Sequence, residues 1–193
     1  AIIEYFGPGA ESISCTGKAT ITNMGAELGA TCSVFPYDER MGSYLGVTGR
    51  RDLAELARRS RHLLRADEEV ESRPDEYFQR VVEIDLSKLE PQIVGPHTPD
   101  LVRPISAMAV EVEEKGYVDR ISDALIGSCT NSSYEDMSRA ADVAEQARAR
   151  GVKVNVPLLV TPGSEQVRAT IERDGQMESL EAIGGTVMAN ACG

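Results

Sequence analysis

The sequence lacks the features of membrane-spanning and secreted proteins, and several residue types are scarce in it. It contains no tryptophan, two histidines and four cysteines in 193 residues. No apolar run approaches the roughly 18 residues that a membrane-spanning helix needs. The N-terminal segment has no basic region followed by an apolar stretch. We therefore expect neither a membrane span nor a secretory signal in this chain.

Basic residues are also scarce relative to acidic ones. The chain has 20 Lys and Arg against 31 Asp and Glu, which gives a formal net charge of −11. Surfaces that bind nucleic acids or anionic membranes depend on lysine and arginine, so this balance argues against both as the main partner. Hydrophobic residues at 41% and charged residues at 26% are typical of a globular protein with a buried core.

The four cysteines are too few for a chain of this length to depend on disulfides. We expect reduced thiols, as in an intracellular protein. The first residue is Ala1 rather than methionine, and the chain stops just after a predicted strand. This pattern indicates an internal piece of a longer protein.

The second half of the chain has the alternating pattern of an α/β domain. The predicted strands are 122–127, 152–160 and 186–190, and the predicted helices are 133–150, 164–173 and 178–183. In the first of these helices Ser132 and Glu135 have capping-box spacing, and Gly151 ends it. Its close-packing face consists of Met137, Ala140, Ala141 and Ala144. The order implies a mostly parallel sheet with right-handed crossovers.

The first half is less regular. We predict helices over 20–29 and 51–66, a charged loop over 67–75 and a half-buried strand over 80–86. Residues 89–104 contain four prolines and follow no helical or strand period, so we interpret them as the connection between two domains, 1–95 and 96–193. The expected architecture is therefore two partial three-layer α/β domains with mostly parallel sheets.

Two cysteines follow predicted strands at the place where α/β proteins bind ligands. Cys129 comes after the strand 122–127, and Cys192 after the strand 186–190, so both are expected at one edge of the sheet. Cys129 also precedes a helix start, whose free backbone N–H groups favour a thiolate. On spacing alone, a metal site and a structural role both stay open, because two thiolates are incomplete ligation for zinc or an iron–sulfur cluster.

Asn23 and Glu27 form a second candidate pair. In a helix over 20–29, with Thr22 or Asn23 as its N-cap, they are four residues apart and share one face. An amide and a carboxylate would then project side by side. The alternative is a solvated helix face without function.

The remaining candidates favour structural roles. Core packing is the preferred interpretation of Cys15 and Cys32. His62 and His97 have no neighbouring acid at useful spacing, so we interpret both as non-catalytic. The glycine-containing turns match neither a dinucleotide-binding nor a P-loop fingerprint.

Seven ordered motifs give the chain a resemblance to the aconitase family. They are IEYFGPG at 3–9, SISCTG at 12–17, NMGAE at 23–27, SVFPY at 33–37, GSCTNSSYEDM at 127–137, TPGSEQVRATIERDG at 161–175 and ANACG at 189–193. The resemblance covers essentially the whole chain and is closest to the mitochondrial-type branch. It departs at Phe6, where this branch has His, and at His97, where it has Phe.

The resemblance implies a hydro-lyase of the tricarboxylic acid cycle, which interconverts citrate and isocitrate through cis-aconitate on a [4Fe–4S] cluster. In the family three irons are held by cysteines and the fourth acts as a Lewis acid. Cys129 matches the first cluster ligand and Cys192 the second, while the third would lie beyond Gly193. Asn23 and Glu27 match the active-site amide and carboxylate.

Two other functions of related proteins stay open: an isopropylmalate or homoaconitate dehydratase, and an RNA-binding iron-regulatory protein. The segments 134–137 and 23–27 favour aconitase, and the net charge of −11 argues against RNA. Other catalytic residues of the family lie in segments that this sequence lacks, so we expect the isolated chain to be inactive. For the full-length enzyme we expect a monomer in a bacterial cytoplasm or a mitochondrial matrix.

Overall fold

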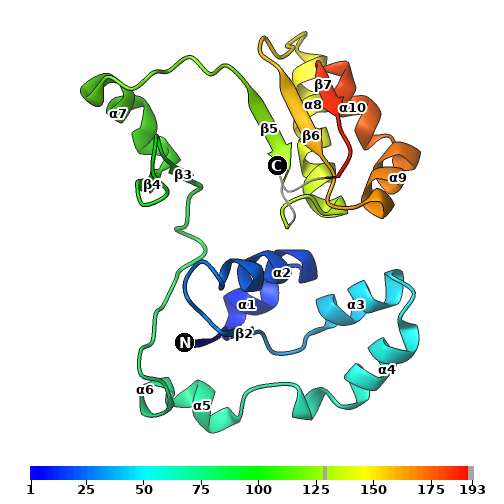
Figure 1. The fold of residues 1–193 in the computed structure, drawn as a ribbon. Helices are drawn as coiled ribbons and strands as arrows, with labels where there is room; N and C mark the ends of the chain where they lie inside the picture. Colours follow the sequence, from blue (N-terminus) through cyan, green and yellow to red (C-terminus); the bar gives the residue numbers. More distant parts are fainter. Residues whose placement is uncertain (128–129, 191–193) are drawn as a thin grey trace. The chain divides into compact units, whose positions relative to one another are not determined.

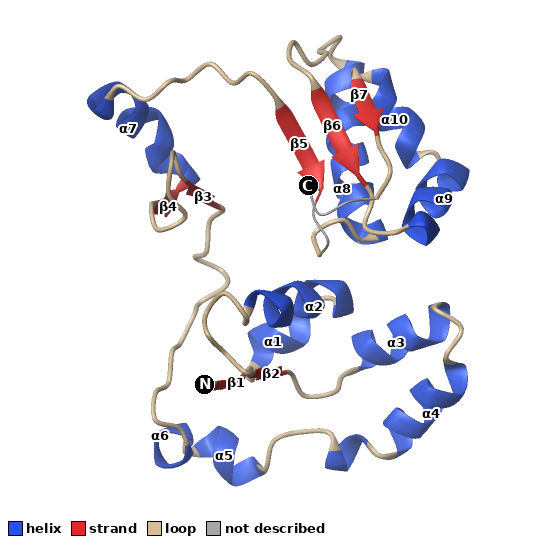
Figure 2. Cartoon of the chain, viewed as in Figure 1, coloured by secondary structure: helices blue, strands red, loops and turns tan. Residues whose placement is uncertain are grey.

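The computed structural model describes residues 1–127 and 130–190. Its backbone contacts divide the chain into two units, Ala1–Ile84 and Asp85–Gly193 (Figure 1). The α/β class predicted from the sequence is confirmed, since two of the three sheets formed by the described residues are parallel and helices connect their strands (Figure 2).

The first unit contains one two-stranded parallel sheet and short helices. In chain order its elements are β1 (Ile2–Glu4), α1 (Pro8–Ser12), α2 (Cys15–Met24), β2 (Cys32–Val34), α3 (Glu39–Val47), α4 (Arg51–Arg59), the 3-10 turn η1 (Arg61–Leu63), α5 (Glu68–Ser72) and α6 (Pro74–Tyr77). In the sheet Ile3 lies opposite Ser33. Just beyond the strands, the rings of Tyr5 and Phe35 stack with centroids 4.4 Å apart.

The helix predicted over 20–29 lies earlier in the chain, as α2. Ser14 caps it, because its hydroxyl accepts a hydrogen bond from the Gly17 N–H at 3.0 Å. The helix ends at Met24, before Gly25 and Gly29, and residues 25–29 form turns. The predicted helix bounds and the predicted cap at Thr22 or Asn23 were therefore wrong.

Three other predictions for the first half need correction. The predicted strand over 80–86 forms no regular structure, ends in a turn and pairs with no strand of the described chain, and Val82 and Ile84 are 65% and 63% exposed. The predicted loop over 67–75 contains α5 and the start of α6, because acidic residues in a first turn complement the helix dipole. The helix predicted over 51–66 ends at Arg59.

The proline-containing segment of the second unit forms a hairpin, where we had predicted no strand. Strands β3 (Gln92–Val94) and β4 (Val102–Pro104) pair antiparallel. Its prolines lie at or beyond the strand ends, where no ladder N–H is required. A 3-10 turn, η2 (Ile105–Ala107), and α7 (Met108–Lys115) follow.

The rest of the second unit is a three-stranded parallel sheet with connecting helices, as predicted. Its elements are β5 (Ala124–Gly127), α8 (Tyr134–Ala149), β6 (Leu158–Thr161), α9 (Glu165–Asp174), α10 (Gln176–Ala182) and β7 (Gly185–Val187). The strand order is β5-β6-β7, so β6 is central (Figure 1). Pro157 directly precedes β6, and its carbonyl accepts a hydrogen bond from Ala124.

The core of this unit lies between the sheet and the three helices. Met137, Ala141 and Ala144 of α8 are buried, so the predicted close-packing face is confirmed. They share a cluster with Val160 of β6 and Leu180 of α10, both fully buried. Burial of these apolar groups holds α8 and α10 on the sheet.

The capping box of α8 lies one residue later than predicted. The hydroxyl of Ser133 accepts a hydrogen bond from the Asp136 N–H at 3.2 Å, and the Asp136 carboxylate accepts one from the Ser133 N–H at 3.1 Å. Ser132 instead lies buried, with 1% of its surface exposed. Gly151 follows the helix with φ of 69°, as predicted for its C-terminal end.

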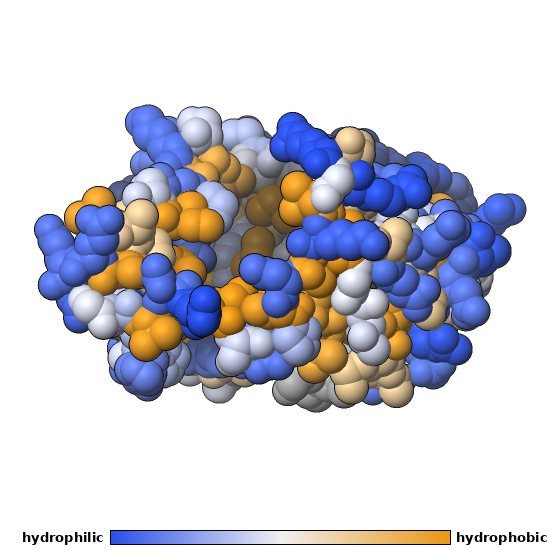
Figure 3. Space-filling model, turned by 90° about the horizontal axis from the view of Figure 1, so that it is seen from above, coloured by the Kyte–Doolittle hydropathy of each residue, from blue (hydrophilic) through white to orange (hydrophobic). Residues whose placement is uncertain are grey.

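Many large apolar side chains in both units reach the surface. Val47, Leu63 and Val118 are 84%, 73% and 87% exposed. In the view of Figure 3, hydrophobic residues lie at the surface between hydrophilic ones. No helix formed by the described residues has the length and apolar character to cross a membrane.

Candidate functional site

The strands β5, β6 and β7 end at one edge of the parallel sheet. Gly127 and Thr161 are the last residues of β5 and β6 and are paired in register. Cys129 follows Gly127 in the sequence, and Cys192 follows β7. Both cysteines lie outside the described residues, so their meeting at this edge stays a prediction.

Two glycines allow the loops after β5 and β6 to lie against each other. A Cβ atom on Gly127, which has φ of 147°, would lie 2.7 Å from the Thr161 carbonyl oxygen. A Cβ atom on Gly163 would lie 2.9 Å from the Ser132 carbonyl oxygen. The Gly163 N–H donates a hydrogen bond to that same oxygen at 3.0 Å. The TPGS segment, residues 161–164, therefore contacts Ser132, which belongs to the described part of the SCTNSS segment.

Thr161 carries a buried hydroxyl at this edge. The residue is 3% exposed, and its Oγ1 has no hydrogen-bond partner in the part of the chain that the structure describes. A buried polar group without a partner costs about 1–3 kcal/mol. A bound group with a hydrogen-bonding sulfur or oxygen atom would remove that cost, so the edge fits such a group.

The helix start after Cys129 offers fewer donors than the sequence suggested. The capping box of α8 engages the N–H groups of Ser133 and Asp136 and places the Asp136 carboxylate in the first turn. Both effects reduce the attraction of this helix start for an anion. The buried hydroxyl of Thr161 is therefore a stronger indication of a bound group at this edge than the helix dipole of α8.

Asn23 and Glu27 lie in the first unit and do not share a helix face. Asn23 is in the last turn of α2, and Glu27 is in the turn that follows it. Both residues are exposed. Three backbone hydrogen bonds hold this turn: from Leu28 to Gly25 at 3.1 Å, from Gly29 to Ala26 at 3.1 Å and from Ala30 to Gly25 at 2.9 Å.

A buried ion pair, which the sequence analysis missed, anchors α2. The side chain of Lys18 is 4% exposed and forms a short contact with Asp38. The other oxygen of Asp38 accepts a hydrogen bond from the Met41 N–H at 3.0 Å and so caps α3. The sequence signal that could have indicated this ion pair is Lys18 itself, the one charged residue of α2.

The two described cysteines differ in environment. Burial raises the pKa of the Cys15 thiol, although the charge of Lys18 opposes this shift. Cys15 is therefore kept as a thiol, which agrees with a packing role. Cys32 is exposed, so core packing was the wrong prediction for it.

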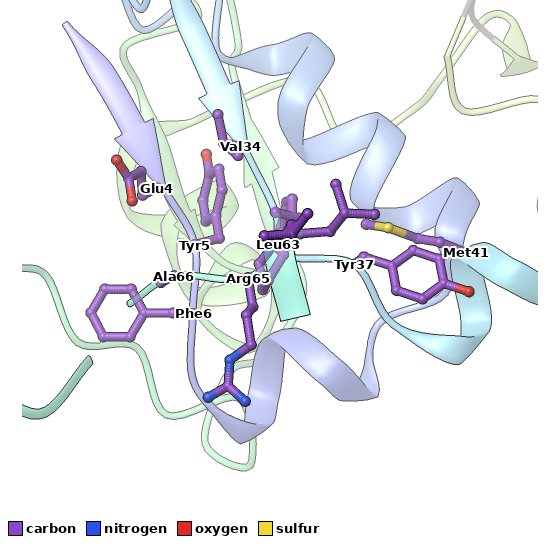
Figure 4. A pocket seen from close by; sticks show the side chains of 12 residues that line it. Glu4, Tyr5, Phe6, Val34, Tyr37, Met41, Leu63, Arg65 and Ala66 are labelled. Atoms are coloured by element: carbon purple, nitrogen blue, oxygen red, sulfur yellow. The ribbon is translucent and has the colours of Figure 1, made fainter. Parts of the chain in front are cut away.

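A cavity of about 410 Å³ lies in the first unit. Its lining is mostly aromatic and aliphatic and comes from the ends of β1, β2 and η1 with the segments that follow them, and from the start of α3 (Figure 4). Neither Asn23 nor Glu27 lines it. Within the described ranges, no group of three or more His, Cys, Asp or Glu residues is arranged to hold a metal ion.

Comparisons with known proteins agree with the motifs. A sequence model of the aconitase family (aconitate hydratase) matches residues 1–193. The probable mitochondrial aconitate hydratase of Dictyostelium discoideum is 54% identical over 193 residues, and the mitochondrial aconitate hydratases of Gracilaria gracilis and Schizosaccharomyces pombe are 55% and 51% identical. In each case the match covers 100% of this chain and 24% of the relative.

Among solved structures, the holo-form of Thermococcus kodakaraensis aconitase X is 26% identical, with a TM-score of 0.33. That match covers 44% of this chain and 22% of the other, and its score is too low to support an argument about fold. The family match, by contrast, extends from the first to the last residue. The chain, which spans about a quarter of the length of its curated relatives, belongs to the aconitase family.

Proposed function

We propose that this chain is part of an aconitate hydratase that interconverts citrate and isocitrate through cis-aconitate. The observation that carries the proposal is the match over all 193 residues, at 54% identity, to a probable aconitate hydratase. The named relatives are mitochondrial, which supports a role in the tricarboxylic acid cycle and, of the two expected locations, favours a mitochondrial matrix over a bacterial cytoplasm.

The donor set of the sheet edge suits an iron–sulfur cluster. Cys129 and Cys192 would hold two of its irons, and a third cysteine would come from outside residues 1–193. When bound, a [4Fe–4S] cluster supplies a Lewis-acidic iron for the removal and addition of water. The buried hydroxyl of Thr161 and the close approach at Gly127 support a bound group at this position.

Asn23 and Glu27 would act on the substrate. Both side chains are exposed, and the hydrogen-bonded turn after α2 gives Glu27 a defined backbone conformation. The Glu27 carboxylate can accept and return a proton at the substrate hydroxyl. The Asn23 amide can donate a hydrogen bond to a sulfur or to a substrate oxygen.

The alternatives have less support. The relatives described above are all named aconitate hydratases, and none is named as a dehydratase of isopropylmalate or homoaconitate. The acidic composition of the chain also disfavours an RNA-binding role.

An exchange of segments tests the proposed activity. Residues 1–193 replace the matching 193 residues of the Dictyostelium relative, and cis-aconitate formation is followed by its ultraviolet absorbance. We expect turnover of citrate and isocitrate but not of isopropylmalate. In the same protein, Glu27→Gln should lower kcat about 100-fold or more, because it removes a proton-transfer group.

The exposed Glu11 provides the matched control, since Glu11→Gln makes the same change elsewhere in the first unit. It should leave kcat unchanged. A hybrid that folds but turns over isopropylmalate in preference to citrate would refute the proposed substrate. Equal rates for the Glu27→Gln and Glu11→Gln variants would refute the role of Glu27.

A further inference from the structure

The hydroxyl of Thr161 is buried at the end of its strand without a hydrogen-bond partner among the described residues. The strand β6 is central in its sheet (Figure 1). Thr161 is its last residue and pairs with Gly127 of β5. It is 3% exposed, and its Oγ1 is fully enclosed without a hydrogen-bond partner among the described residues. A valine has the same shape and would fill this space without the cost of burying a hydroxyl.

Threonines in the helices of this chain avoid that cost. The hydroxyls of Thr20 in α2 and Thr170 in α9 donate to a carbonyl four residues earlier, at 3.2 and 2.6 Å, and that of Thr48, directly after α3, does the same at 2.6 Å. A strand residue has no such carbonyl within reach of its own side chain. The Thr161 hydroxyl therefore needs a partner from outside β6.

The contacts around Thr161 show where that partner would lie. A Cβ atom on Gly127 would overlap the Thr161 hydroxyl, so the hydroxyl lies against the end of β5, just before the segment that contains Cys129. Pro162 is fully buried, and the hydrogen bond from Gly163 to Ser132 holds the chain after it. The hydroxyl is thus buried against Gly127 at the end of β5, and the chain after it is held at Ser132.

We propose that the Thr161 hydroxyl donates a hydrogen bond to a sulfur of the group bound at this edge, either a cysteine thiolate or a cluster sulfide. The inference rests on the proposed function. Sulfur atoms in such a cluster carry negative charge and accept hydrogen bonds, and these bonds affect both retention of the metal and its reduction potential. Loss of the donor would make reduction harder, because the added electron increases the negative charge on the sulfurs.

The test uses the full-length hydratase that carries residues 1–193, reconstituted anaerobically with iron and sulfide. Thr161→Val removes the hydroxyl and keeps the shape. We expect the apoprotein to be at least as stable as the parent in urea, because an unpaired buried hydroxyl is lost. The loaded protein should bind its cluster about tenfold more weakly in a chelator competition, and its reduction potential should be more negative.

Thr161→Ser retains the hydroxyl and should keep the potential of the parent. Thr186→Val makes the same chemical change at an exposed position of β7 and should change neither readout. If Thr161→Val does not fold, Thr161→Ser and Thr161→Ala still differ only in the hydroxyl. The comparison of those two variants then provides the same test.

The outcomes separate the two proposals. Equal cluster retention and equal potential in the variants with and without the hydroxyl would overturn the role of Thr161 and leave the proposed function standing. A parent protein that takes up no iron and converts no citrate would overturn the proposed function itself.

Discussion

Lys18 and Asp38 join α2 to the start of α3 through a buried ion pair. The two side chains are 4% and 17% exposed, and Asp38 also caps α3. Lys18→Ala would leave a mostly buried carboxylate without its partner, so we expect it to lower the free energy of unfolding by about 3–5 kcal/mol. Urea denaturation of the chain, followed by circular dichroism, measures this loss.

The exposed pair of Arg59 and Glu55 on α4 is the control for this prediction. Arg59→Ala should have little effect, because surface ion pairs contribute little to stability. The double variant Lys18→Met, Asp38→Asn removes both charges and should recover most of the loss. Equal destabilisation by Lys18→Ala and Arg59→Ala would show that the buried pair does not stabilise this unit.

At the scale of the elements, the contact between α8 and α10 includes an ionised carboxylate at its edge, that of Glu145. The Ser179 hydroxyl donates to Glu145 at 2.6 Å, and Arg148 donates to the other oxygen at 2.8 Å. These hydrogen bonds, chiefly the one from Ser179, lower the pKa of Glu145. The folded state therefore binds this proton less readily than the unfolded state, for which the ordinary value is 4.5.

This difference predicts a loss of stability in acid. The contribution of Glu145 is fully present above its unfolded pKa and is lost as the pH falls through its lower folded pKa. Ser179→Ala should therefore lower the urea midpoint at about pH 7 but change it less at about pH 3. Thr170→Val, whose hydroxyl bonds only a backbone carbonyl, serves as the control. The same loss at both pH values would contradict this linkage.

At the scale of the whole molecule, the chain consists of two units joined by an exposed segment. Between Tyr77 and Gln92 the chain forms neither helix nor strand, and residues 79–89 are exposed. Proteases cleave such segments first, because backbone without regular structure fits their active sites. We expect limited trypsin digestion to cut first after Arg80 and Lys88 and to leave two fragments that match the units.

Arg139 is the internal control for this digestion. It is 75% exposed but lies within α8, so its peptide bond should resist cleavage as long as the second unit is folded. Fragment masses identify the order of the cuts. Cleavage after Arg139 before Arg80 or Lys88 would contradict the division into two units.

Local sequence signals determined much of the second unit. Gly151 ends α8 as predicted, and the alternation of apolar runs with helical patterns predicted the succession of strands and helices and their parallel sheet. These features depend on neighbours in the sequence, so local periodicity and capping chemistry are enough to predict them. The long motifs likewise determined the family, which the comparison over residues 1–193 confirmed.

Other features were decided only by tertiary structure. Residues 80–86 have a strand pattern but no partner strand in the part of the chain that the structure describes, whereas residues 92–94 and 102–104 pair although Pro91 and Pro104 lie at their ends. The ion pair of Lys18 joins residues that lie far apart in the sequence, and the enclosure of the Thr161 hydroxyl depends on Gly127. The physical reason is the same in each case: pairing and burial depend on which distant segment supplies the partner, and no local pattern contains that information.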